Sequence, residues 1–557
     1  MMGQKVRQCS MFFGCWHSLI PENHFLRQVE RVVDFSFIRK KVAHLYSHTG
    51  RPSIDPEVLI RILLIGYFYG ITSERELMEQ IRVNLAFREF IGYELDEEIP
   101  DHSTLSKNRH GRFKGTSVFQ EIFDEIVRQC MAAGLVAGKH LSFDGTTIQA
   151  NASYDSMVPR RVVEMSPAEY IQKVEQENPV TPEVEEEQQM SMEEGTTLDD
   201  SGTPPGSNGN FCSVASGPED ALVTDDTADT PQEGLSFASK AGGGKKMSGK
   251  SRRSEKKTNA THISRTDPDA RIFARPGQPK KLGYIECVTV DSLYNIITGV
   301  EVIPGNADEA RVLVPMITSQ MFKFGFRVDS VSGDKAHGES RVYKELLALG
   351  IKPFIPHQNF HETNRNIWPQ EKFRYDAKED CYICPNGKVL RYQGCIDRGI
   401  MKVYRTRPRD CKDCPYKSQR TTSEKVGRTI KRHVDARVFE YVDRLLKRPE
   451  AREAAIWRRT GPETVFGEAK EYHGLRRAKF RGLEHVKEQC LLTATAQNIK
   501  RMVKALTRRK PPKVREAAMP ARTLKANQVQ TRSSFSLIQS NLTALCSGPI
   551  VFQRAIA

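Results

Sequence analysis

Apolar positions at helical spacing fill much of the first 135 residues. The strongest run spans residues 54–70, where Asp55 and Pro56 are typical of a helix N-cap and first helical position. Gly70 ends that run, and Ser73, with a Glu three positions later, indicates the start of the next helix. Similar spacing predicts further helices at four places: 25–45, 83–92, 106–113 and 116–135. We therefore predict an all-helical domain over residues 1–135.

The same region carries Arg and Lys near its turns, as in the basic stretch around Lys107 and Arg109. Short helices joined by tight turns and flanked by basic residues are typical of a helix-turn-helix DNA-binding module. A plain helical bundle that serves dimerisation has the same periodicity. The spacing alone leaves both interpretations open.

Short apolar runs with β-like composition replace the helical pattern after residue 136. They predict strands, separated by two helices that end near residues 317 and 349, at the following ranges: 141–150, 282–291, 295–304, 328–334 and 351–356. An amphipathic pattern returns at 462–472 and 484–505. This order predicts an α/β core, a mixed sheet with flanking helices, built from residues 136–155, 261–356 and 456–506.

Two segments are too polar to belong to that core. Residues 156–260 begin acidic, continue rich in Gly, Ser, Thr, Pro and Asp, and end basic, with few apolar residues. Such a composition cannot offset the entropy lost on folding, so it predicts a disordered charged insertion. It is either an inert tether or a segment whose basic end touches DNA. Residues 507–557 predict a basic flexible tail.

A second insertion, residues 357–455, contains two Cys-x-x-Cys pairs: Cys381, Cys384, Cys411 and Cys414. Four thiolates in two such pairs, each followed by Pro, are typical of a small zinc-ribbon-like unit around a structural Zn²⁺. The alternative is a set of four reduced, buried cysteines.

Composition narrows the class of partner. The chain has 84 Lys and Arg against 69 Asp and Glu, a net charge of +15, and 38% hydrophobic residues. That balance favours nucleic acid or an anionic membrane. No uninterrupted apolar run reaches the roughly 18–20 residues of a membrane span, so we expect no membrane partner. The first residues lack the long apolar core of a secretory signal, and we therefore expect a cytoplasmic protein.

Three carboxylates from distant segments are the candidate chemistry. Asp144 lies in a predicted strand, Asp334 follows another, and Glu463 lies in the first turn of a helix that Pro462 opens. Oxygen ligands from such positions suit Mg²⁺ or Mn²⁺ in an open cleft. Taken alone, the Glu463 helix reads equally well as a solvated amphipathic helix.

The motifs around these acids resemble the three signatures of DDE transposases from bacterial insertion sequences: D-G-T at Asp144, G-D-K-A at Asp334, and Arg459-x3-Glu463-x6-Lys470. The Tyr that often stands three residues before the Arg is Ile456 here. The resemblance implies a ribonuclease H-like core with a cysteine-rich insertion before the catalytic Glu. It also implies that the three acids bind metal and catalyse DNA strand cleavage and strand transfer at terminal inverted repeats.

The resemblance further implies DNA as a partner, a homodimer or larger assembly on it, and a location at the bacterial nucleoid. The basic residues expected to contact DNA are Arg459, Lys470, Arg476, Arg477 and Lys479. Two alternatives are a DNA-binding protein derived from a transposase that has lost catalysis, and a nuclease that cuts without joining.

Overall fold

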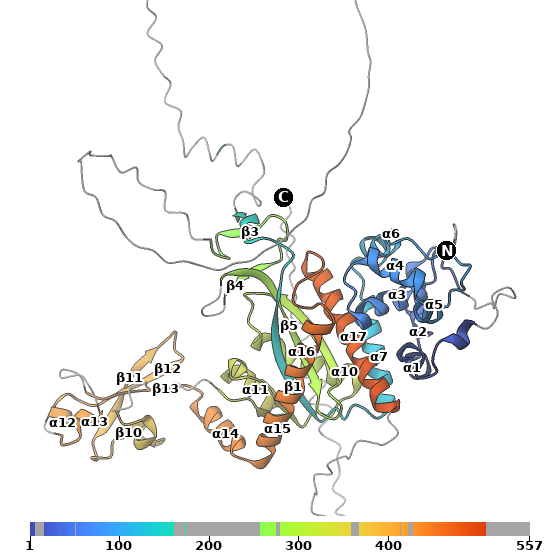
Figure 1. Cartoon of the computed structure of the whole chain (residues 1–557). Coiled ribbons are helices and arrows are strands. Elements are labelled where there is room, and N and C mark those ends of the chain that lie inside the picture. Colours follow the sequence, from blue (N-terminus) through green and yellow to red (C-terminus); the bar gives the residue numbers. More distant parts are fainter. Residues whose placement is uncertain are drawn as a thin grey trace, which may run out of the picture.

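The computed structural model describes residues 1–5, 16–50, 52–160, 172, 257–274, 279–357, 367–412, 414–420 and 427–507. The predictions made for most of the charged insertion and for the C-terminal tail lie outside these residues. Figure 1 shows the helical N-terminal region beside a large sheet, with a smaller sheet at the opposite end of the molecule.

The N-terminal region is helical, as predicted. Its helices are α1 (Phe25–Val32), α2 (Phe37–Val42), α3 (Pro56–Tyr69), α4 (Glu74–Val83), α5 (Leu85–Ile91), α6 (Ser103–Lys107) and α7 (Val118–Ala132). The predicted caps are present: the Asp55 carboxylate accepts from the backbone N–H of Glu57, and the Ser73 hydroxyl from that of Glu76. Gly70 ends α3 with a φ of 72°, a left-handed conformation that glycine adopts readily.

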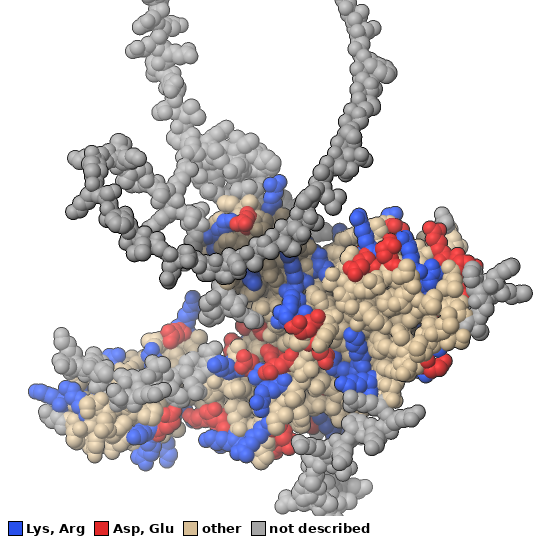
Figure 2. Space-filling model, in the orientation of Figure 1, with Lys and Arg blue, Asp and Glu red and all other residues tan. Residues whose placement is uncertain are grey.

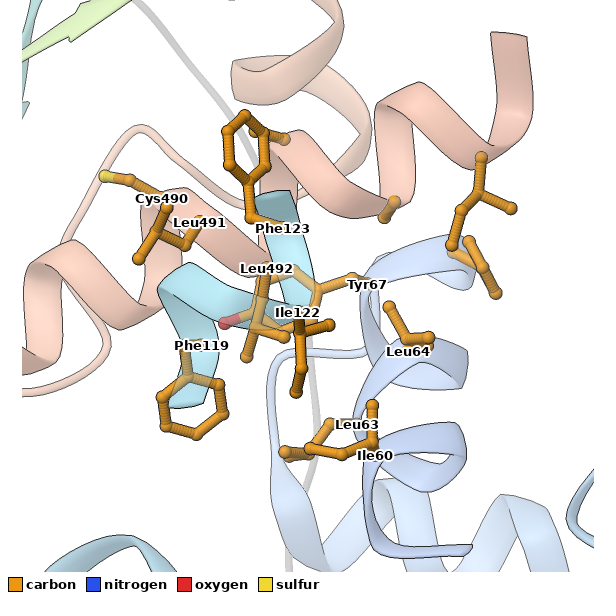
Figure 3. Packing of buried hydrophobic residues seen from close by; sticks show 14 of the residues in the cluster. Ile60, Leu63, Leu64, Tyr67, Phe119, Ile122, Phe123, Cys490, Leu491 and Leu492 are labelled. Carbon is orange, nitrogen blue, oxygen red and sulfur yellow. The ribbon is translucent and has the colours of Figure 1, made fainter. Parts of the chain in front are cut away.

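Helix α3 is buried on nearly every side, and Tyr69 is its most exposed residue. It packs with α7 and with the long C-terminal helix α17 (Leu483–Thr507) in one continuous apolar core. Figure 3 shows side chains of the three helices meeting in this core. A helix enclosed in this way cannot enter a DNA groove, so a DNA-binding role for residues 1–135 rests on their other helices and remains a prediction.

The large sheet is mixed, as predicted. Its strands are β1 (His140–Gln149), β4 (Arg271–Phe273), β5 (Lys281–Asp291), β6 (Ile297–Pro304), β7 (Ser330–Ser332) and β8 (Lys352–Phe354). Strand β5 lies antiparallel to β1, β6 and β4, whereas β7 lies parallel to β1 and to β8. The strand order is therefore β4-β5-β1-β7-β8, and β6 also pairs with β5.

Helices cover both faces of this sheet. Alternation along β5 sends Ile285 and Cys287 toward α10 (Ala310–Phe324) and α11 (Ser340–Ala348), and sends Val288 and Val290 toward α16 (Pro462–Tyr472) and α17. Helix α17 thus lies between the sheet and the N-terminal helices, which share its core. The predicted amphipathic helix over 484–505 packs against the sheet as expected.

Two helices fall partly or wholly within the range predicted as the cysteine-rich insertion. They are α14 (Ala436–Leu446) and α15 (Pro449–Thr460), and both pack on the large sheet or its flanking helices. The core therefore resumes near Ala436, about twenty residues before the predicted boundary at 456. The two helices stand between the cysteine pairs and the Glu463 motif and were therefore assigned to the insertion, although α14 carries Phe439, Val442 and Leu445 at helical spacing.

The rest of the insertion forms a separate antiparallel sheet in the order β13-β12-β11-β10-β9. Its strands are β9 (Arg374–Asp376), β10 (Cys381–Ile383), β11 (Val389–Ile396), β12 (Met401–Arg405) and β13 (Thr429–His433), with short helices α12 (Arg409–Lys412) and α13 (Lys417–Arg420). It has a small core of its own, which includes Tyr382, Leu390 and Tyr404. A two-stranded sheet, β2 (Met157–Pro159) and β3 (His262–Ser264), flanks the charged insertion.

Within the described part of the chain, no single helix is long and apolar enough to cross a membrane. The pair α3 and α4, bent by 98° at their junction, meets the length and composition criteria together. Helix α3 is a core helix in this fold.

Candidate active site

Asp144 lies near the middle of β1, where the parallel pairing with β7 has already ended. That pairing covers His140–Ser142 only, so Asp144 stands just beyond the last paired residue. The carboxylate is half-buried and accepts a hydrogen bond from the backbone N–H of Gly145 at 2.8 Å. A strand in the centre of the sheet therefore fixes the first candidate acid.

Glu463 is linked to Asp144 by the side chain of Arg458, which lies near both carboxylates. The Arg458 guanidinium lies 3.3 Å from Asp144 Oδ2 and 3.9 Å from Glu463 Oε1. Helices α15 and α16 are separated only by Gly461, so the last turn of one adjoins the first turn of the other. The Trp457 ring packs on His140 of β1, with ring centres 4.6 Å apart, and holds the end of α15 against the strand.

Asp334 completes the group from the other side. It follows β7 directly and its carboxylate accepts from the backbone N–H of Lys335 at 2.7 Å. Burial raises the pKa of Asp144, and the neighbouring Asp334 charge raises it further, while Arg458 and His337 oppose that shift. Asp144 is thus in electrostatic reach of Asp334 and linked through Arg458 to Glu463.

The donor set fits a hard divalent cation. Asp144 and Glu463 both lie beside the Arg458 guanidinium, and Asp334 is near enough to raise the pKa of Asp144, so the centre favours added positive charge. Among the described residues, no three His, Cys, Asp or Glu side chains are already arranged as metal ligands. Arg458 stands between Asp144 and Glu463, and it must move before these two acids can share an ion.

Two of the basic residues expected to bind DNA point inward. The Lys470 ammonium donates to Thr146 Oγ1 at 2.5 Å, and Thr146 lies opposite Glu286 in the sheet. Lys479 is half-buried over the ring of Tyr67, with its ammonium 4.3 Å from the ring centre, and burial lowers its pKa to about 8. These contacts give both lysines a structural role.

The other three, Arg459, Arg476 and Arg477, are exposed. Arg476 forms an ion pair with Glu471, and Arg477 donates to Asn151 Oδ1 at 3.3 Å. Arg481, also exposed, donates to the backbone carbonyl of Asn151 at 3.1 Å. Figure 2 shows basic side chains beside acidic ones on the face of the molecule that carries α16.

Only some of the four predicted zinc ligands lie close together in the small sheet. Cys384 Sγ accepts from the backbone N–H of Lys388 at 3.3 Å, and Asn386 of the same turn contacts Cys414 Sγ at 3.6 Å. Cys381, by contrast, lies on β10 outside the core that holds Cys384. No metal-ligand cluster of three occurs in this described part of the insertion. The zinc site therefore stays a prediction.

Sequence reasoning missed three residues of the candidate active site: Arg458, Glu309 and His337. Arg458 is the neighbour of the motif residue Arg459, and the pattern of α15 did not reveal which of the two points inward. His337 stands three residues after Asp334, as the only buried residue of a short 3₁₀ turn. Glu309 immediately precedes α10. Only the folded chain shows that the last two meet.

Comparison with known proteins agrees with the motifs. Residues 14–111 match the family described as Transposase domain (DUF772), and residues 383–503, which include Glu463, match Transposase DDE domain. The resemblance to DDE-class transposases is confirmed. Asp144 and Asp334 lie outside both matched ranges, so their place in the transposase site rests on the geometry above.

A solved structure of a piggyBac transposase synaptic complex with hairpin DNA also matches, with 10% identity over 87% of this chain and 79% of that chain. Its TM-score is 0.26, too low for the likeness to carry an argument about this chain. The search of curated proteins gave no match.

Proposed function

We propose that this protein is the transposase of a bacterial insertion sequence. It would bind the terminal inverted repeats of its element, as a dimer or larger assembly at the nucleoid, and would cleave and join DNA strands by metal-dependent phosphoryl transfer. The observation that carries the proposal is the meeting of Asp144 and Glu463 on Arg458, within electrostatic reach of Asp334.

The topology supports a ribonuclease H-like catalytic core. Three antiparallel strands in sequence, β1, β5 and β6, are followed by β7 and β8, which extend the sheet parallel to β1 on its other side. In such a sheet the first acid stands on the central strand and the second at the end of the strand beside it. Asp144 and Asp334 occupy these two positions.

The acids Asp144, Asp334 and Glu463 would hold Mg²⁺ or Mn²⁺. When bound, such ions activate the attacking water or 3′-hydroxyl and stabilise the leaving oxygen of an in-line displacement at phosphorus. Asp144 is set by the sheet, whereas Glu463 is 56% exposed on the first turn of α16 and adjusts more freely. The chain thus offers one acid on the sheet, one just beyond the end of β7 and one exposed acid on a helix.

Arg458 has two successive roles in this proposal. Without a cation it balances Asp144 and Glu463. With those carboxylates engaged as metal ligands, the guanidinium would be free to donate to a DNA phosphate, for which its planar fork is well suited. The exposed Arg459, Arg476 and Arg477 would hold more distant phosphates and set the register of the DNA end.

The test is a strand-cleavage and strand-transfer assay with the full chain, Mg²⁺ and labelled duplexes that carry the terminal sequences flanking the coding frame. We expect cleaved ends that are joined to a target duplex, and we expect Asp144→Asn to bind the same duplex without cleaving it. Binding without cleavage by the wild type would favour the derived DNA-binding protein, and cleavage without joining would favour the nuclease.

A further inference from the structure

A fourth carboxylate lies against the strand that carries Asp144. Gly145 has so little room above it that a Cβ placed there would collide with Oε2 of Glu309. Glu309 is the residue before α10, and its side chain is 29% exposed, so the carboxylate is partly open to solvent. The absence of a side chain at Gly145 is what admits it.

His337 holds this carboxylate in place. Its Nε2 lies 3.3 Å from Glu309 Oε2, and its ring packs edge-on against Phe143, with centres 4.9 Å apart. The imidazole is 2% exposed, and its other nitrogen, Nδ1, is buried without a hydrogen-bond partner among the described residues. A side chain this enclosed has little freedom, so it fixes the direction in which Glu309 points.

The two residues that contact Glu309, Gly145 and His337, belong to the segments that carry Asp144 and Asp334. Gly145 directly follows Asp144, and His337 lies in the short turn that Asp334 opens. Alternation along β1 points positions 144 and 145 to opposite faces of the sheet. Since the pairing of β1 with β7 ends at Ser142, groups from both faces can approach β1 at this point. The influence of His337 on Asp144 agrees with such closeness.

We propose that Glu309 is a positioning residue of the candidate active site, a fourth acidic group held beside Asp144 by His337. The inference rests on the proposed function, because it assumes that a divalent cation binds at Asp144. Mg²⁺ keeps several of its waters when it binds to proteins, and a nearby carboxylate stabilises the ion by accepting hydrogen bonds from them. Glu309 therefore strengthens and orients the ion that the other acids hold.

The experiment titrates the full chain with Mn²⁺, without DNA, and follows free Mn²⁺ by electron paramagnetic resonance. We expect Glu309→Gln to weaken Mn²⁺ binding about tenfold, the size typical of a residue that supports metal ligands. Asp308→Asn is the matched control, because Asp308 is adjacent, exposed and paired with Arg311. Asn at 308 can still accept from the backbone N–H of Ala310, so the control should bind Mn²⁺ as the wild type does.

Gly145→Ala tests the same point without removing a charge. The added methyl group must displace the Glu309 carboxylate, so we expect weaker Mn²⁺ binding here as well, and little further loss when it is combined with Glu309→Gln. Near-additive losses in the double variant would contradict the coupling. Thermal unfolding of each variant separates this effect from misfolding.

The outcomes distinguish this inference from the proposed function. Asp144→Asn is expected to abolish tight Mn²⁺ binding. If it does so while Glu309→Gln stays within twofold of wild type, Glu309 has no role and the inference is overturned. If Asp144→Asn leaves Mn²⁺ binding unchanged, the candidate active site itself is wrong.

Discussion

The sequence predicts two metal sites: an acidic centre, formed by Asp144, Asp334 and Glu463, and the four cysteines of the cysteine-rich insertion. The structure brings the acids together more fully than the cysteines. The acids come from three distant segments; the fold brings Asp144 and Glu463 together at Arg458 and places Asp334 within electrostatic reach of Asp144. The cysteines come from one short region, and Cys381 lies apart from the core that includes Cys384. Proximity in sequence is therefore a poor guide to which ligands converge.

The difference arises from how much packed structure surrounds each set of ligands. Asp144 lies on a ten-residue strand paired on one side over nearly its whole length and covered by helices on both faces. Cys381 begins a three-residue strand in a small sheet, whose core is a handful of side chains. A large core fixes side-chain directions before any metal binds, whereas a small one often depends on the metal to do so.

The largest expected effect tests the acidic centre. Glu463→Gln should reduce Mg²⁺-dependent strand cleavage at least about a thousandfold, because a metal ligand contributes no less than a single oxyanion-hole donor. DNA affinity, measured by fluorescence anisotropy, should be unchanged. Glu471→Gln is the matched control, since Glu471 is exposed on the same helix and pairs with Arg476. Cleavage at the wild-type rate by Glu463→Gln would remove this acid from the centre.

The next effect tests the insertion. Asn386 joins the turn of Cys384 to Cys414, so we expect both thiols to hold zinc in the purified chain. Cys384→Ser should lose the zinc measured by elemental analysis, and with it several kcal/mol of the insertion's stability. Cys395→Ser should keep its zinc, because Cys395 is exposed and contacts Tyr392. A zinc-free wild type would favour the alternative of four reduced cysteines.

A smaller effect concerns Glu286, a buried residue of β5, the strand that pairs with the strand of Asp144. Burial raises the pKa of Glu286 to about 7, against which the charge of Lys470 acts only in part. The unfolded chain loses this proton at lower pH than the folded chain does, so Glu286 makes stability fall as pH rises from about 4.5 to 7. The loss is at most about 3 kcal/mol.

Glu286→Gln should remove that loss, because the amide stays neutral at every pH. Thermal unfolding of variant and wild type should therefore agree near pH 4.5 and diverge in favour of the variant by pH 8. Glu453→Gln, at an exposed carboxylate, should show no such divergence. Parallel curves for Glu286→Gln and wild type would mean that Glu286 is ionised in the folded protein at neutral pH.

Much of the fold was predictable because its signals are local. Asp55, Pro56 and Gly70 bound α3 through capping and backbone preferences that act within one helical turn. Strands β5 and β6 were predictable because each is a short run of mostly apolar residues. Helix α14 also carries a local signal, with Phe439, Val442 and Leu445 at helical spacing, but the local pattern does not say whether a helix packs on the insertion or on the large sheet.

The candidate active site was predictable only in its acids. Motif spacing identified Asp144, Asp334 and Glu463, but direction in space decides the roles of their neighbours. Lys470 belongs to the same motif as Glu463 and yet donates to Thr146 inside the fold. Arg458 belongs to no motif and yet bridges two of the acids. Such roles depend on which side of a helix meets the sheet, and no local pattern encodes that.

The smallest expected effect separates Arg458 from its neighbour Arg459. Arg458 competes with a divalent cation for Asp144 and Glu463, because a guanidinium and an ion cannot occupy the same space between them. Arg458→Gln should therefore strengthen Mn²⁺ binding in the absence of DNA by roughly tenfold, the equivalent of one charge-assisted hydrogen bond. The same variant should be less stable without metal, since the acids then repel one another unopposed.

Arg459→Gln is the matched control, and it should affect DNA binding but not Mn²⁺ binding. Its side chain is exposed and has no part in the bridge, so Mn²⁺ binding should not change. DNA binding should weaken a few-fold, with the salt dependence of the affinity reduced by about one ion, as for the loss of one phosphate contact. If Arg458→Gln instead weakened Mn²⁺ binding, Arg458 would be holding the acids in place for the ion rather than competing with it. The acidic centre would then depend on Arg458 for its shape, whereas the cysteine-rich insertion is expected to depend on a bound cation.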